Sequence, residues 1–301
     1  MADMSVNIAG VTLKNPVMTA SGTFGSGMEY SEFVDLSRLG AVVTKGVANV
    51  PWPGNPTPRV AEVYGGMMNA IGLQNPGIDL FCKRDIPFLK KYDTKIIVNV
   101  CGHAPEEYLA VVERLADEPI DMMEINISCP NVNAGFLAFG QDAKHVEELT
   151  AQIKKIAKQP IIMKLTPNVT DITEIAKAAE AGGADALSLI NTLTGMKIDI
   201  NRRTFAVANK TGGVSGPVVH PIAVRMVYQT TQAVNIPIIG MGGIATPEDA
   251  IEMILAGASA VSVGTANFYN PNATIEIIDG IEAYMKKNGF ESVKDMVGIV
   301  K

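Results

Sequence analysis

Cys129 stands in a polar segment and is the residue of this sequence best suited to act on a substrate. Asn126 and Ser128 precede it, Asn131 follows it, and Pro130 stiffens the turn. A cysteine that acts as a nucleophile needs an activating group such as a histidine, and none of the three histidines follows a neighbouring strand pattern in an obvious place. The segment therefore favours a general base that removes a proton from an acidic carbon–hydrogen bond.

Two lysines close to the ends of apolar runs are the candidate cations. Lys45 ends the run 41–45, and Lys164 stands one residue before the end of the run 160–165. Burying an unpaired ammonium costs free energy, so each should reach an open mouth of the fold or extend to solvent. Two chemical uses stay open: stabilising negative charge on a reduced ring or a carboxylate, and forming a Schiff base with a carbonyl substrate.

Two glycine-rich turns late in the chain indicate a phosphate site. Gly242 and Gly243 follow one apolar run and precede a helical pattern that Thr246 can cap, and Gly264 and Thr265 follow one unit later. Glycine lets the backbone approach an anion, and N–H groups at a helix N-terminus point towards it. Tight strand-to-helix turns are the alternative use of these glycines, but the two turns together favour phosphate.

Eight short apolar runs recur along the chain, and helical patterns separate most of them. Several runs are apolar at nearly every position, as strands buried on both faces of a parallel sheet are. The runs cover residues 16–20, 41–45, 95–100, 121–128, 160–165, 186–191, 237–243 and 260–265. Helical spacing covers 106–117, 144–158, 171–181, 221–233, 247–256 and the segment after 272. Eight such units predict a (β/α)8 TIM barrel, with a doubly wound open sheet as the alternative.

In a TIM barrel the active site lies at the C-terminal ends of the strands. Polar residues or glycines stand at or near all eight predicted ends, and buried polar groups need partners. A ligand rich in hydrogen-bonding atoms would supply them. These residues are Ser21, Lys45, Gly46, Asn99, Asn126, Lys164, Asn191, Thr192, Gly242, Gly243, Gly264 and Thr265.

The bulk composition indicates one globular domain over residues 1–301, with residues 1–13 expected to form a hairpin under the barrel. The net charge of −6 argues against a nucleic-acid partner, which needs clustered lysine and arginine. No apolar stretch reaches membrane-spanning length, and no signal peptide is visible. The three cysteines contain no CxxC pair. A disulfide framework and a metal site are therefore not expected, and a reducing, cytoplasmic compartment fits best.

Several motifs resemble those of one protein family, and they follow one another along the chain in that family's order. The segment 126–132 (NISCPNV) resembles the catalytic loop of class 1 dihydroorotate dehydrogenases, and 69–77 (NAIGLQNPG) resembles their orotate-binding loop. The segments 44–46 (TKG), 164–168 (KLTPN), 191–192 (NT) and 212–217 (GGVSGP) match as well. The AIGLQN wording and the loop cysteine resemble subclass 1B. Class 2 enzymes carry serine in that loop and an additional N-terminal segment, and this sequence shows neither.

The resemblance implies a role for each matching residue. Cys129 would take the C5 proton of dihydroorotate while C6 passes a hydride to FMN. Lys45 would balance the substrate carboxylate, and Lys164 would steady negative charge on the reduced flavin. FMN would contact Ser21, Lys45, Gly46, Asn99, Asn126, Lys164, Ile190, Gly216, Gly242, Gly243, Gly264 and Thr265. The pyrimidine would be held by Lys45, Asn69, Ala70, Ile71, Gly72, Leu73, Asn126, Asn191 and Thr192.

Membership of subclass 1B further implies a partner subunit that carries FAD and a 2Fe–2S cluster and passes electrons to NAD. The expected assembly is a heterotetramer of two subunits of each kind. The chain has no four-cysteine set for a cluster, so a cluster would lie on the partner. The sequence departs from the family at Phe136, where we expect a glycine pair near Gly135. We expect the bulky side chain to affect the motion of a lid over the site and the turnover rate, but not the type of reaction.

Three alternatives stay open at this point. The first is a fumarate-linked homodimer of subclass 1A, which works without a partner. The second is another flavin barrel that acts on uracil derivatives or on tRNA, although the acidic charge balance argues against tRNA. The third is a barrel that binds a phosphorylated ligand as an aldolase or isomerase, or without catalysis.

Overall fold

Eight parallel strands close into a barrel in the computed structural model, which describes residues 2–127 and 139–300. Each barrel strand lies within one of the predicted apolar runs, so the TIM-barrel prediction is confirmed. Around the barrel the strands follow the order of the chain. They are β3 (Val17–Thr19), β4 (Ala41–Val43), β7 (Lys95–Val100), β8 (Met122–Asn126), β9 (Ile161–Lys164), β10 (Ala186–Leu189), β15 (Ile238–Met241) and β16 (Ala260–Val263).

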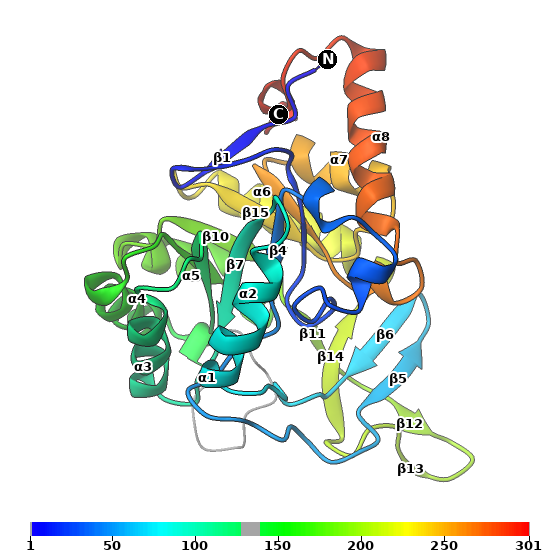
Figure 1. Ribbon diagram of the computed structural model, residues 1–301. Helices are drawn as coiled ribbons and strands as arrows, with labels where there is room; N and C mark the ends of the chain where they lie inside the picture. Colours follow the sequence, from blue (N-terminus) through cyan, green and yellow to red (C-terminus); the bar gives the residue numbers. More distant parts are fainter. Residues whose placement is uncertain (1, 128–138, 301) are drawn as a thin grey trace.

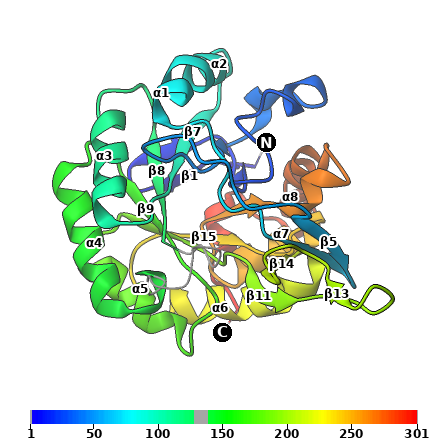
Figure 2. The same ribbon diagram turned by 90° about the horizontal axis from the view of Figure 1, so that it is seen from below.

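Six longer helices follow the last six barrel strands, and Figure 2 shows helices on the outside of the ring. They are α3 (Pro105–Leu115), α4 (Ala143–Ile156), α5 (Ile172–Ala181), α6 (His220–Thr231), α7 (Pro247–Leu255) and α8 (Ala273–Asn288). All six overlap predicted helices. After β3 the chain makes only two short 3-10 turns, and after β4 it makes three short helical pieces, α1 (Ile78–Leu80), a π-helical turn (Phe81–Asp85) and α2 (Ile86–Leu89).

The start of α7 shows how the sequence fixes an element next to the predicted phosphate turn. The Thr246 hydroxyl accepts a hydrogen bond from the Asp249 N–H (3.3 Å), and the Asp249 carboxylate accepts one from the Thr246 N–H (2.9 Å). This reciprocal capping satisfies backbone donors that have no partner inside the helix. Pro247 occupies the first helical position, where its missing N–H is not needed. The helix therefore begins four residues after Gly243.

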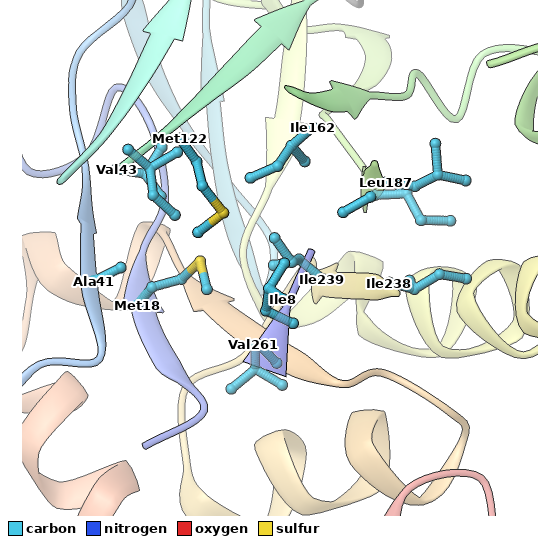
Figure 3. Packing of buried hydrophobic residues seen from close by; sticks show 14 of the residues in the cluster. Ile8, Met18, Ala41, Val43, Met122, Ile162, Leu187, Ile238, Ile239 and Val261 are labelled. Atoms are coloured by element: carbon cyan, nitrogen blue, oxygen red, sulfur yellow. The ribbon is translucent and has the colours of Figure 1, made fainter. Parts of the chain in front are cut away.

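The N-terminal segment forms an antiparallel hairpin of β1 (Val6–Ile8) and β2 (Val11–Leu13). Ile8 is fully buried, and Figure 3 shows it among Met18, Ile239 and Val261 of the barrel strands. Apolar side chains thus fill this end of the molecule. The polar strand ends lie at the other end, where a ligand can reach them.

An additional antiparallel sheet, which the sequence analysis did not predict, lies at the opposite end of the molecule from β1 (Figure 1). Its order is β11 (Leu193–Met196), β14 (Thr211–Ser215), β6 (Gly66–Asn69) and β5 (Val60–Val63). A small hairpin of β12 (Ile198–Asp199) and β13 (Thr204–Phe205) extends beside it. The strands come from the long connections after β4 and after β10. They are short, and three of them contain glycine, which is depleted in strands.

Among the residues that the structure describes, no helix combines the length and the apolar character needed to cross a membrane. Nor does this part of the chain bring together three or more histidine, cysteine, aspartate or glutamate side chains that could hold a metal ion.

Candidate active site

A cavity of about 740 Å³ opens at the C-terminal ends of the barrel strands. Residues at the ends of the barrel strands form part of its wall, and β5, β6 and β14 of the additional sheet form another part. This volume falls in the range of small-molecule sites, about 300–1,000 Å³. The additional sheet therefore covers the mouth of the barrel and turns open strand ends into an enclosing pocket.

Most of the predicted site residues meet at this one cavity. Those that line it are Ser21, Lys45, Asn69, Ile71, Gly72, Leu73, Asn126, Lys164, Ile190, Asn191, Thr192, Gly216, Gly242, Gly243, Gly264 and Thr265. They come from segments up to about 240 positions apart in the chain. Cys129, the predicted base, and Phe136 lie outside the described residues.

Three predicted contact residues lie behind the cavity wall rather than on it. Asn99 is fully buried. A side chain at Gly46 would place its Cβ 2.8 Å from Asn99 Oδ1, so only glycine fits there. Ala70 packs with Met68 and Val207 in a small apolar cluster under the additional sheet. Asn99 lies on β7, where side chains alternate between the two faces of the strand, and the sequence alone did not show which face it occupies.

A glycine cradle occupies one end of the cavity. Gly216, Gly242 and Gly243 have φ angles of +100°, +128° and +70°, which L-residues with a side chain rarely adopt. A Cβ at Gly243 would lie 2.7 Å from the His220 Cβ and 2.8 Å from the Gly216 carbonyl oxygen. Nearby, the Thr265 hydroxyl donates to Ser215 Oγ (2.8 Å). Exposed backbone and hydroxyl groups in such a cradle suit a phosphate group.

His220 contacts both this cradle and α7. Its Nδ1 donates to the Gly242 carbonyl oxygen (2.9 Å), and its Nε2 lies 3.1 Å from a carboxylate oxygen of Glu252 on α7. The histidine residue is 7% exposed. A carbonyl oxygen only accepts, so this contact fixes the proton on Nδ1. The turn of Gly242 and Gly243 is thus held in place by a side chain from the first turn of α6.

A polar network lies beneath the cavity inside the barrel. Glu124 on β8 accepts hydrogen bonds from Asn99 Nδ2 (2.6 Å) and from the Ser188 hydroxyl (2.8 Å). Lys164 Nζ lies 3.4 Å from the same carboxylate. Asn126 Nδ2 lies 3.5 Å from Asn99 Oδ1. Lys164 is 4% exposed and Glu124 2% exposed, so the network joins a buried ion pair to amides that reach the cavity wall.

The loop that leads from β6 towards α1 supplies another wall of the cavity. Gly72 and Leu73 both have positive φ angles, +73° and +53°. Asn75 holds this turn, because its Nδ2 donates to the Leu73 carbonyl (2.8 Å) and its Oδ1 accepts from the backbone N–H of Gly77 (2.9 Å). Residues in this region of φ persist where their surroundings hold them. The loop therefore presents a preformed wall to a ligand.

The two cysteines that the structure describes are buried. Cys82 is 7% exposed, and Cys101 is fully buried. Burial, and then the nearby Glu118 carboxylate, raise the pKa of the Cys82 thiol to about 11. A thiol with such a pKa is inert at neutral pH. Both cysteines therefore behave as small buried side chains.

Sequence reasoning missed several polar residues of the site, including Gln74, Ser215 and Ser262 on the cavity wall and Glu124 beneath it. Ser215 lines the cavity inside the glycine motif 212–217. Glu124 is the only charged residue of the strand 122–126 (MMEIN) and stands two positions before Asn126, on the same face. An acidic residue in an otherwise apolar barrel strand is a signal that could have identified Glu124, since buried charges are paired.

Comparison with known proteins gives a consistent family. The dihydroorotate dehydrogenase family model matches residues 3–285. The chain is 69% identical to the protein named dihydroorotate dehydrogenase B (NAD(+)), catalytic subunit, of Lachnoclostridium phytofermentans, over 99% of both chains. It is 64% identical to the protein of the same name from Alkaliphilus metalliredigens, over 98% of both. These names confirm the resemblance to subclass 1B.

The fold has a solved counterpart as well. A crystal structure of DHODH from Eimeria tenella in complex with ferulenol aligns with a TM-score of 0.82. The alignment covers 99% of this chain and 88% of that one, at 24% identity. At this identity the likeness supports the barrel fold, and the family rests on the sequence matches. With the whole length of the chain matched by close relatives, this protein belongs to the dihydroorotate dehydrogenase family.

Proposed function

We propose that this protein is the catalytic subunit of an NAD-linked dihydroorotate dehydrogenase, which oxidises (S)-dihydroorotate to orotate on bound FMN in UMP biosynthesis. The observation that carries the proposal is the single cavity in which a glycine cradle, two lysines and several asparagine amides meet. The names of the close relatives support the same activity.

The residues of the cavity fit FMN. The cradle of Gly216, Gly242 and Gly243, with Gly264 and Thr265 beside it, would hold its phosphate, because backbone and hydroxyl groups line the cavity there. Lys164 and Asn126 would hold the flavin ring at the other end of the cavity. When bound, FMN supplies a two-electron acceptor.

The remaining wall would hold the pyrimidine. Lys45 would pair with the substrate carboxylate, and the amides of Asn69, Asn126 and Asn191 would satisfy the ring N–H and carbonyl groups, because an amide both donates and accepts. The loop that includes Gly72 and Leu73 would shield the ring from water. Cys129 would take the proton from C5. This proposed role rests on the motif 126–132 alone, because the cysteine lies outside the described residues.

A second subunit is part of the proposal. The relatives carry the name "catalytic subunit", which supports a separate partner. We propose that the partner carries FAD and a 2Fe–2S cluster, that it passes electrons to NAD, and that two subunits of each kind assemble. The chain has three cysteines, fewer than the four that a cluster of this kind uses.

An anaerobic half-reaction tests the proposal. The purified chain is loaded with FMN, dihydroorotate is added, and the flavin absorbance near its visible maximum is followed. We expect the yellow colour to bleach and orotate to appear in equal amount. Fumarate should not restore the colour at a catalytic rate, because that acceptor belongs to the subclass 1A alternative. A chain that binds no FMN, or FMN that dihydroorotate does not bleach, would refute the assignment.

A further inference from the structure

The barrel interior beneath the cavity holds a carboxylate for which the proposed reaction gives no role. Glu124 lies on β8 with Met122 and Asn126 at alternate positions on either side, so the three side chains share the inner face of the strand. Its side chain is 2% exposed. Burying a carboxylate costs several kcal/mol unless partners compensate, which suggests that the charge at this position has a use.

Both oxygens of the carboxylate are occupied. Oε1 accepts from Asn99 Nδ2 at 2.6 Å and lies 3.4 Å from Lys164 Nζ, and Oε2 accepts from the Ser188 hydroxyl at 2.8 Å. The three partners come from β7, β9 and β10. Glu124 therefore ties three strands to β8 immediately under the cavity floor.

The carboxylate also fixes the direction of an amide relay. An ionised carboxylate only accepts hydrogen bonds, so Asn99 must turn its NH2 group towards Glu124. Its Oδ1 then faces Asn126 Nδ2, at 3.5 Å. Asn126 lines the cavity. The Asn126 amide at the cavity wall is thus linked through Asn99 to a buried carboxylate two residues earlier in the same strand.

The second effect is electrostatic. Lys164 lines the cavity and is 4% exposed, so its ammonium is shielded from water and acts strongly on a bound ligand. Glu124 offsets part of that positive charge at 3.4 Å. Interactions between charges at such sites are only weakly screened by solvent or salt. A ligand that gains negative charge would therefore be stabilised less than Lys164 alone would stabilise it.

We propose that Glu124 is a positioning residue that orients Lys164 and the Asn99–Asn126 amides towards the flavin and lowers the flavin reduction potential. This inference rests on the proposed function, because it takes FMN as the ligand. Its chemistry needs no proton transfer to Glu124. The carboxylate acts through fixed hydrogen bonds and through its charge.

The test measures the two-electron midpoint potential of bound FMN at pH 7 in the FMN-loaded protein. Glu124→Gln keeps the volume and removes the charge. We expect the equilibrium to shift towards reduced flavin by about tenfold, which is a rise of about 30 mV for a two-electron couple. FMN binding should weaken at the same time, because glutamine can present either end of its amide to Asn99.

Two control variants separate charge from packing. Ser188→Ala removes one hydrogen bond to the carboxylate but leaves its charge, so the potential should stay within a twofold change of the equilibrium. Asp85→Asn neutralises another buried carboxylate, which is 3% exposed and pairs with Arg84 outside the cavity lining. This variant should reduce stability without moving the potential.

Glu124→Gln leaves the Lys164 ammonium buried without its carboxylate, which destabilises the fold. A double variant that also carries Lys164→Gln removes this unpaired charge. Lys164→Gln alone should lower the potential, and Glu124→Gln in that background should raise it again by about tenfold in the equilibrium. Equal potentials in Lys164→Gln and in the double variant, or a wild-type potential in Glu124→Gln, would overturn the inference. Failure of the wild-type chain to bind FMN would instead overturn the proposed function.

Discussion

At the scale of single residues, the proposed chemistry gives each polar side chain of the cavity a separate role. Lys45 lines the cavity close to Gly22, where a Cβ would lie 3.6 Å from its Nζ. Lys164 lies deeper and beside Glu124. The two lysines therefore differ in burial, which fits one role at a substrate carboxylate and another at a flavin. The Schiff-base use is less suited to Lys164, because its ammonium pairs with a carboxylate.

The role of Cys129 gives a sharp prediction at this scale. Cys129→Ser replaces the thiol with a hydroxyl that is a far weaker acid, so proton removal from dihydroorotate should slow. We expect flavin reduction by dihydroorotate to fall by at least about a hundredfold, the usual size of a general-base contribution, while FMN binding stays intact. Stopped-flow absorbance under anaerobic conditions measures the rate.

Cys82 provides the matched control for that variant. Burial raises the pKa of its thiol to about 11, and Cys82 does not line the cavity. Cys82→Ala should therefore leave the rate of flavin reduction unchanged at pH 7. An unchanged rate in Cys129→Ser would remove that residue from the mechanism.

The sequence identified many residues of the cavity wall, some because polar groups at the ends of barrel strands must converge and others, such as Asn69 and Gly216, only from the family resemblance. It did not separate residues on the wall from those behind it. Asn99 stands in a predicted strand and Ala70 in the motif 69–77, yet both side chains are buried and neither lines the cavity. One position along a strand decides which face a side chain occupies. In a loop such as 69–77, the spacing of a motif does not show which side chains face the cavity.

At the scale of elements, the barrel strands and the longer helices were predictable, since continuous apolar runs and helical spacing are strong signals. The additional sheet was not. Its strands β6 and β14 contain Gly66, Gly212 and Gly213, and they pair across some 145 positions of the chain, as Asn69 does with Gly213. Local pattern carries no information on such distant pairing. This sheet forms the cavity cover, so the sequence did not show how the barrel mouth is enclosed, which depends on long-range contacts.

The glycine cradle yields a prediction at this scale. Gly243→Ala adds a Cβ 2.7 Å from the His220 Cβ in a turn with φ of +70°. The cradle should then shift, and we expect the dissociation constant of FMN to rise at least about tenfold, equivalent to about 1.4 kcal/mol of binding free energy. Fluorescence titration of the apoprotein with FMN measures it.

Gly289 is the matched control for the cradle. It ends α8 with φ of +75°, and a Cβ there meets nothing within 4 Å. Gly289→Ala carries the same backbone strain of about 1 kcal/mol but leaves the cradle untouched. It should lower the free energy of unfolding without changing FMN affinity. Equal losses of affinity in both variants would show that strain alone, and not the cradle, explains the effect.

At the scale of the whole molecule, one set of side chains stabilises the barrel and another forms the ligand site. Apolar side chains from the hairpin and the barrel strands fill the end of the barrel that carries Ile8 (Figure 3), whereas glycines, lysines and amides meet at the other end. The fold should not need the ligand in order to form, because its main core does not include the cavity. Ligand binding should instead add stability to a barrel that is already folded.

Removal of FMN tests this separation. We expect the apoprotein to keep the far-ultraviolet circular dichroism of the loaded protein. FMN at a hundred times its dissociation constant should add about 2.7 kcal/mol, which raises the melting temperature by roughly 4 °C for a chain of this size. At the same concentration, riboflavin should raise it much less, because it lacks the phosphate that the cradle would bind. Equal shifts with both ligands would place the binding energy in the ring rather than in the cradle, and loss of the helical signal in the apoprotein would show that the barrel itself depends on the flavin.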